Sequence, residues 1–184
     1  MPVTRDAIAK TFMELAVRHG YRRTTVEDVA RELHISKKTV YEHFSSKADL
    51  LRCALELGAW EQRARVESQL TEATPLGRIQ QVVGIALADA RRFYEAQPHA
   101  EMVEPPEITT QIDDLVFGPM VRDLLAEAVA AGEFEAPDID VTAAFVVAMG
   151  SEAVRMIRDD PSRHPEATLL DALRRLVARE TSES

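Results

Sequence analysis

The sequence predicts an all-α protein of about nine helices, and three observations support this fold class. Apolar residues recur along most of the chain at the three- and four-residue spacing of one helix face. Alternating apolar and polar runs bounded by turn residues, which indicate strands, are missing from the sequence. The 184 residues are 46% hydrophobic, which is typical of a globular protein with a packed core.

The first two helices are predicted from apolar spacing and from residues that begin or end a helix. Apolar residues from Ile8 onward occupy one face of a first helix, and Gly20 supplies its C-terminal stop. Thr25 is a preferred N-cap for a second helix. Asp28 lies three residues later, at the spacing of a capping box. This second helix ends near Leu33 and is about two turns long.

The next two helices follow two further N-cap residues. Ser36 begins a short helix that is expected to bury Val40 and Phe44, which lie four residues apart on one face. Ser46 begins a fourth helix, and Asp49 three residues later predicts a second capping box.

Prolines and caps divide the rest of the chain into further helices. The fourth helix is predicted over 47–72 and the fifth over 76–97, and the prolines that follow break the chain into shorter pieces. Pro119 fits the first turn of another helix, and Asp140 is the expected cap of a long one. The last helix is predicted over 165–179.

The compartment is indicated by three features of the sequence. The first ten residues lack the apolar stretch of a secretory signal. No apolar run approaches the ~20 residues that cross a bilayer. Cys53 is the only cysteine, so an internal disulfide is excluded. We therefore expect a cytoplasmic protein that has no contact with a membrane.

Charge is distributed unevenly along the chain. Residues 1–52 contain ten lysines and arginines and seven acids, a net charge of +3, whereas the whole chain carries −9 and the remainder therefore −12. A basic head on an acidic body predicts that only the head meets a polyanion. Chance asymmetry of a solvated surface is the alternative.

The segments 25–33 and 36–44 are two short helices joined by only a few residues, which predicts a helix-turn-helix. Ala30 is the small residue expected where the two helices cross. The outer face of the second helix then offers hydrogen-bond donors to DNA: Lys37, Lys38, Thr39, Tyr41 and His43.

The stretch GYRRTTVEDVARELHISKKTVYEHFSSKADLL, residues 20–51, resembles the DNA-binding segment of the TetR family of bacterial transcription regulators. The resemblance is carried by the Thr-Thr pair, by Ala30, by the S-K-K-T-V-Y-x-H-F core and by the trailing S-K-x-x-L-L. His34 departs from it, because the family commonly has glycine at this turn, where the backbone tends toward positive φ. Histidine adopts positive φ at some cost, so we expect a strained or altered turn.

The resemblance implies that residues 36–43 form a recognition helix in the major groove. Its lysines would reach guanine edges or phosphates, and Tyr41, Lys47 and Thr25 would anchor phosphates. The expected DNA-binding residues are Thr25, Ser36, Lys37, Lys38, Thr39, Tyr41, His43 and Lys47. Packing of Tyr41 on the core and plain solvation of Lys37 are the alternatives.

The resemblance also implies a DNA-binding domain over 1–55 and a helical ligand-binding and dimerisation domain over 56–184. The last two long helices would pair with those of a second copy, unless their apolar stripes face their own core. The expected dimer residues are Val141, Ala148, Leu169, Leu173, Leu176 and Val177. The candidate lining of an effector pocket is Trp60, Phe93, Met102, Phe117, Met120, Phe145 and Met149.

An enzyme is disfavoured, because the sequence contains no G-x-S-x-G, P-loop or H-E-x-x-H motif. His99, Glu101 and Glu104 are the one cluster with metal-like chemistry, but they lack recognisable ligand spacing. We therefore expect no metal, no cofactor and no catalysis. The resemblance implies a ligand-responsive repressor that binds a palindromic operator as a dimer. The alternative is a DNA-binding adaptor without an effector, whose acidic body makes protein contacts.

Overall fold

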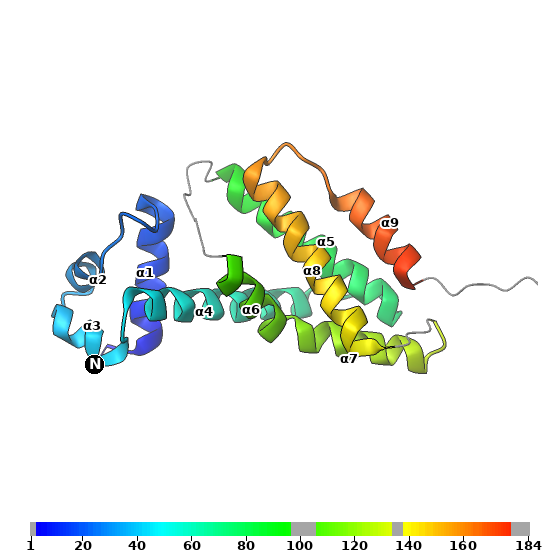
Figure 1. Ribbon diagram of the computed structural model, residues 1–184, viewed down its shortest axis with the longest axis horizontal. Helices are drawn as coiled ribbons and strands as arrows, with labels where there is room; N and C mark the ends of the chain where they lie inside the picture. Colours follow the sequence, from blue (N-terminus) through cyan, green and yellow to red (C-terminus); the bar gives the residue numbers. More distant parts are fainter. Residues whose placement is uncertain (1–2, 97–105, 134–137, 178–184) are drawn as a thin grey trace, which may run out of the picture. The chain divides into compact units, whose positions relative to one another are not determined.

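The computed structural model describes residues 3–96, 106–133 and 138–177, which form nine α-helices and no strands (Figure 1). The all-α prediction is confirmed. The helices are α1 (Arg5–His19), α2 (Val26–Glu32), α3 (Lys37–His43), α4 (Lys47–Ser68), α5 (Pro75–Ala96), α6 (Pro106–Val116), α7 (Gly118–Ala130), α8 (Ile139–Asp159) and α9 (Glu166–Val177).

The chain divides into two compact units. The N-terminal unit extends to Glu61 and includes α1–α3 and most of α4, whereas the C-terminal unit includes α5 and α7–α9. The boundary falls within α4, and α6 is divided between the units after Ile112. The domain boundary expected at residue 55 stays a prediction.

The N-terminal unit is held by one apolar core to which α1, α2, α3 and α4 contribute. α1 begins at the N-cap Thr4 and ends at Gly20, whose φ of 87° confirms the expected glycine stop. The core residues are Ile8, Ala9, Phe12, Leu15, Val26, Val29, Ala30, Val40, Phe44, Leu50, Leu51 and Ala54.

The first predicted capping box is confirmed and the second is modified. Thr25 Oγ1 accepts from the Asp28 N–H at 3.2 Å, and Asp28 Oδ2 accepts from the Thr25 N–H at 2.9 Å. At α4, Ser46 Oγ accepts from the Asp49 N–H at 3.1 Å, as expected. The Asp49 carboxylate, however, accepts from the N–H of Ser45 at 2.9 Å, one residue before the position that a capping box uses.

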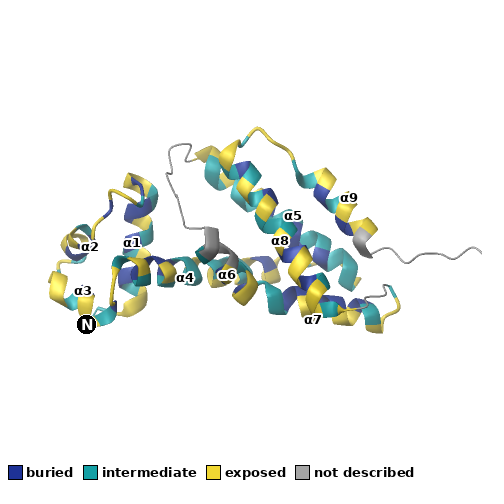
Figure 2. Cartoon of the chain, viewed as in Figure 1, coloured by how far each residue is buried: buried dark blue, intermediate teal, exposed yellow. Residues whose placement is uncertain are grey.

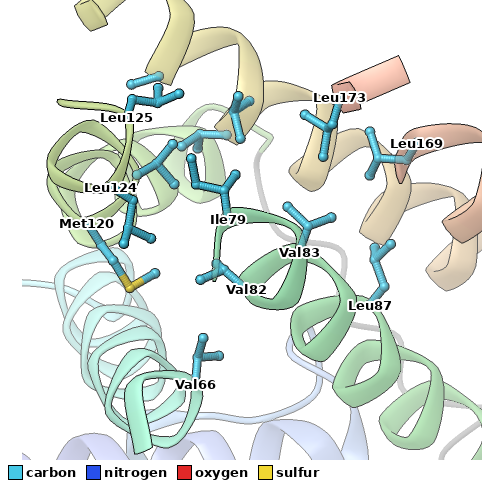
Figure 3. Packing of buried hydrophobic residues seen from close by; sticks show 14 of the residues in the cluster. Val66, Ile79, Val82, Val83, Leu87, Met120, Leu124, Leu125, Leu169 and Leu173 are labelled. Carbon is cyan, nitrogen blue, oxygen red and sulfur yellow. The ribbon is translucent and has the colours of Figure 1, made fainter. Parts of the chain in front are cut away.

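The C-terminal unit has a second apolar core, built by α5, α7, α8 and α9 together with Val66 of α4 (Figure 3). Pro119 lies in the first turn of α7, as predicted. Two boundaries differ from the sequence prediction. α4 ends at Ser68 rather than near residue 72, and α8 is capped by Asp138, whose side chain accepts from the Val141 N–H, rather than by Asp140.

Arg91 of α5 fixes the loop between α8 and α9. Its guanidinium donates to the carbonyl of Pro161, to the carbonyl of Arg163 at 2.6 Å and to the Glu166 carboxylate, with Nε at 3.0 Å. Burial raises the pKa of Glu166, but the hydrogen bond from Arg91 contributes in the opposite direction, and the net pKa lies below its ordinary value. One side chain thus joins α5 to the start of α9.

Candidate nucleic-acid interface

The helix α3 has an inner and an outer face. Val40 and Phe44 are buried in the N-terminal core, as the sequence predicted. Part of α3 is coloured as exposed in Figure 2. Lys37, Lys38 and Tyr41 are exposed, and 47% of Tyr41 is accessible to solvent. The alternative of Tyr41 packing on the core therefore does not hold. α3 begins at Ser36, whose Oγ accepts from the Thr39 N–H at 3.0 Å, and Thr39 and His43 are half-buried at its flanks.

The turn before α3 depends on a left-handed residue. His34 has φ of 54° and is the one non-glycine residue with positive φ in the described part of the chain, which confirms the expected strained turn. The Ile35 N–H donates to the Ala30 carbonyl at 2.9 Å and the His34 N–H to the Arg31 carbonyl at 3.2 Å. These two bonds form the Schellman motif that usually contains glycine. They end α2 and direct the chain into α3.

Lys37 connects α3 to α2. Its ammonium forms an ion pair with the Glu27 carboxylate and lies 5.7 Å from the centre of the Tyr41 ring. The hydrogen bond from Lys37 lowers the pKa of Glu27, and the same bond raises the pKa of Lys37. Lys37 is therefore not merely solvated. Its contact with DNA stays a prediction.

Lys47 contacts the loop that follows α1. It is half-buried, its Nζ donates to the Tyr21 carbonyl at 2.7 Å, and this nitrogen lies 4.3 Å from the centre of the Tyr21 ring. Burial lowers the pKa of Lys47. An ammonium has three donors, so the bond to Tyr21 leaves others for a phosphate. The expected phosphate contacts of Lys47 and Thr25 stay predictions.

Arg5 supports the C-terminal end of α3, and the expected DNA-binding residues did not include it. Its Nη1 donates to the His43 carbonyl at 2.7 Å, Nη2 donates to Asp49 at 3.2 Å, and the guanidinium lies 4.3 Å from the centre of the Phe44 ring. Arg5 thereby joins the start of α1 to the end of α3. No local pattern reveals a contact between residues 38 positions apart.

The residues expected to line an effector pocket do not form one cluster. Met120 is buried in the C-terminal core, and Phe117 and Met149 pack against that core. Phe93 is half-buried, whereas Phe145 and Trp60 are exposed. Met102 lies outside the described residues.

The residues expected at a dimer interface differ in exposure. Val141 is 48% exposed, and Ala148 is also exposed on α8. Leu169 and Leu173 are buried in their own chain, on the side of α9 near Val83 and Leu87 of α5 (Figure 3). This burial leaves little of either leucine to contact a second copy, so the own-core alternative applies to both. The side chains of Leu176 and Val177 lie outside the described residues.

The sequence cluster of His99, Glu101 and Glu104 also lies outside the described residues. Within the part of the chain that the structure describes, no three His, Cys, Asp or Glu side chains are placed to hold a metal ion. No helix in that part has the length and apolar character that a membrane crossing requires.

Known proteins resemble this chain both in sequence and in fold. The model of the family "Bacterial regulatory proteins, tetR family" matches residues 8–54. The HTH-type transcriptional regulator TcmR of Streptomyces glaucescens is 26% identical over 162 residues, which are 84% of this chain and 71% of TcmR. The DNA-binding transcriptional repressor TetR of Mycobacteroides abscessus is 36% identical over 50 residues, 27% of this chain and 26% of that protein.

Two solved structures share the fold over nearly the whole chain. RolR in complex with resorcinol is 16% identical, with a TM-score of 0.72, and the match covers 97% of this chain and 89% of RolR. FadR of Bacillus subtilis in complex with stearoyl-CoA is 17% identical, with a TM-score of 0.68, over 93% of this chain and 96% of FadR. At these identities the likeness establishes the fold alone.

Proposed function

Because the chain belongs to the TetR family of bacterial transcriptional regulators, we propose that it is a ligand-responsive repressor that binds a palindromic operator as a homodimer. The family is not enzymatic, in agreement with the missing catalytic motifs. The observation that carries the proposal is the two-faced helix α3, with Val40 and Phe44 inside and Lys38 and Tyr41 outside. A cytoplasmic location follows, since the operator lies there.

DNA contact in this proposal is made by the N-terminal unit. α3 lies in the major groove, with Lys38 and Thr39 at its N-terminal end directed to base edges. Tyr41, Lys47 and the free amides at the start of α2 contact phosphates and set the position of the helix. The net charge of +3 over residues 1–52 favours approach to the polyanion.

Dimerisation is assigned to the outer face of α8, which consists of Val141, Ala144, Phe145 and Ala148. All four are exposed, including 48% of Val141 and 57% of Phe145. They fall at i, i+3, i+4 and i+7, which forms one continuous apolar stripe. Apolar side chains gathered on one face mark an interaction surface, and a second copy of α8 offers the complementary one. Two recognition helices are needed to read the two halves of a palindrome.

Regulation by a ligand is assigned to the C-terminal unit. The named complexes of RolR with resorcinol and of FadR with stearoyl-CoA support a ligand for a chain of this fold. Phe117, Met120 and Met149, which share one core, are the remaining candidates for its contacts. A ligand that binds better to the state unable to bind DNA shifts the population away from the operator. The relative from Mycobacteroides abscessus is named a transcriptional repressor, which supports repression rather than activation in this proposal.

The test is selection of bound DNA from a random pool. We expect a palindrome whose half-sites lie about one helical turn, roughly 34–36 Å, apart. A recovered motif without symmetry would refute the homodimer, and no enriched motif would refute specific DNA binding. Addition of phenolic and acyl compounds to the protein–DNA complex tests the ligand. We expect one of these two classes of compound to release the protein from DNA. If neither class changes DNA binding, the adaptor alternative is favoured.

A further inference from the structure

The outward side of α3 carries an acid that the expected DNA-binding set did not include. Successive residues of an α-helix are turned by about 100°, so the direction opposite the buried Val40 falls between Lys38 and Glu42, about 20° from each. Both side chains are exposed, by 87% and 59%, and Nζ of Lys38 lies 3.9 Å from Oε1 of Glu42. The two side chains that point most directly away from the core are therefore a hydrogen-bond donor, Lys38, and an acceptor, Glu42, and they lie side by side.

Helix stability does not account for this arrangement. A Lys–Glu pair at i and i+4 stabilises a helix best when the acid comes first, and here Lys38 precedes Glu42. α3 has only seven residues, so Lys38 lies in its first turn, where the dipole disfavours a cation, and Glu42 in its last, where it disfavours an anion. The positions of both charges are therefore unfavourable for the stability of the helix by itself.

A carboxylate in this position limits what α3 can contact. Ionised Glu42 only accepts hydrogen bonds, and phosphate oxygens also only accept, so Glu42 gains nothing from the DNA backbone and is repelled by it. In the major groove the donors are the N4 amino group of cytosine and the N6 amino group of adenine, and Glu recognises the former. Lys38 has the opposite chemistry and donates to guanine O6 or N7.

We propose that Glu42 is a specificity-determining residue that accepts a hydrogen bond from cytosine N4, while Lys38 donates to an adjoining guanine. This inference rests on the DNA-binding function proposed above. The pair matches a G·C element, because the amino group of cytosine and the acceptors of guanine lie together on the major-groove edge. Glu42 also disfavours other sequences, since its charge then lies beside phosphates with no amino group to bind.

The experiment compares DNA selected from a random pool by the wild-type chain, Glu42→Gln, Glu42→Ala and the control Glu14→Gln. Glu14 is an exposed acid on α1, so the control makes the same charge change on another helix. Glutamine prefers adenine, so Glu42→Gln should shift one position of each half-site from cytosine toward adenine. The ratio of Kd values for the two bases should change by roughly 5- to 150-fold. Glu42→Ala should lose the preference and bind random DNA more tightly.

The outcomes separate this inference from the function on which it rests. A wild-type motif whose base preferences are unchanged in both Glu42 variants overturns the role of Glu42 and leaves DNA recognition intact. An equal change in Glu14→Gln overturns it as well, because the effect is then one of net charge. If the wild-type chain enriches no motif, the DNA-binding function fails first. Thermal unfolding of each variant establishes that the selected protein is folded.

Discussion

Replacement of His34 by glycine tests the energetics of the turn between α2 and α3. His34 has φ of 54° within a Schellman motif, where a residue with a Cβ atom costs about 1–2 kcal/mol. Glycine avoids this cost but gives the unfolded chain more freedom, which offsets about 0.5–1 kcal/mol. The His34 side chain is exposed and makes no described hydrogen bond or ion pair. We therefore expect His34→Gly to raise the free energy of unfolding by roughly 0–1.5 kcal/mol.

The assay is thermal and urea unfolding of the wild-type chain, His34→Gly and His34→Ala. For a chain of this size, 1 kcal/mol corresponds to a shift in Tm of about 2–4 °C. The alanine variant keeps the Cβ atom and should unfold below the glycine variant by about 1 kcal/mol. A glycine variant less stable than wild type by more than about 1 kcal/mol would refute the reasoning, because His34 would then make stabilising contacts that its exposure does not indicate.

Three further changes test other parts of the molecule. Phe145→Glu places a charge on the outer face of α8 and should convert a dimer to folded monomers in light scattering; an unchanged mass would place the interface elsewhere. Lys47→Ala should reduce the slope of log K against log salt by about one unit if Lys47 contacts a phosphate, and an unchanged slope removes it from the interface. Arg91→Met should lower the free energy of unfolding by about 1.5–3 kcal/mol at pH 7. The pKa of Glu166 is lowered in the folded chain, so its contribution is present above the ordinary glutamate pKa of about 4.3 and disappears as the pH falls through the folded value. The difference in stability between wild type and Arg91→Met should therefore shrink in acid to the part contributed by the carbonyls of Pro161 and Arg163, and a difference that does not change with pH would contradict this account.

Local features of the fold were predictable where one short segment determines them. The Thr25–Asp28 capping box and the positive φ of His34 depend on neighbouring residues, and both are confirmed. The cap of α8 was misassigned because Asp138 and Asp140 are both good caps two residues apart, and only the geometry selects between them. The outer face of α3 follows from the expected burial of Val40, whereas the expected DNA-binding residues on that face did not include the acid Glu42.

Long-range features could not be predicted in this way. Arg5 reaches the end of α3 across 38 residues, and nothing near Arg5 in the sequence indicates that contact. The apolar stripe of α9 was expected to meet a second copy, yet Leu169 and Leu173 pack in their own chain. The spacing of apolar residues along the sequence identifies the apolar face of a helix, but it does not show which surface that face packs against.

The position of α9 has a consequence for how the protein would work in a cell. Leu169 and Leu173 complete the core within a single chain, and Arg91 ties the preceding loop to α5, so contacts within one chain hold the start of α9 in place. For the proposed homodimer, a protomer held together in this way would make promoter occupancy rise with roughly the square of copy number at low expression, which is steeper than a proportional response.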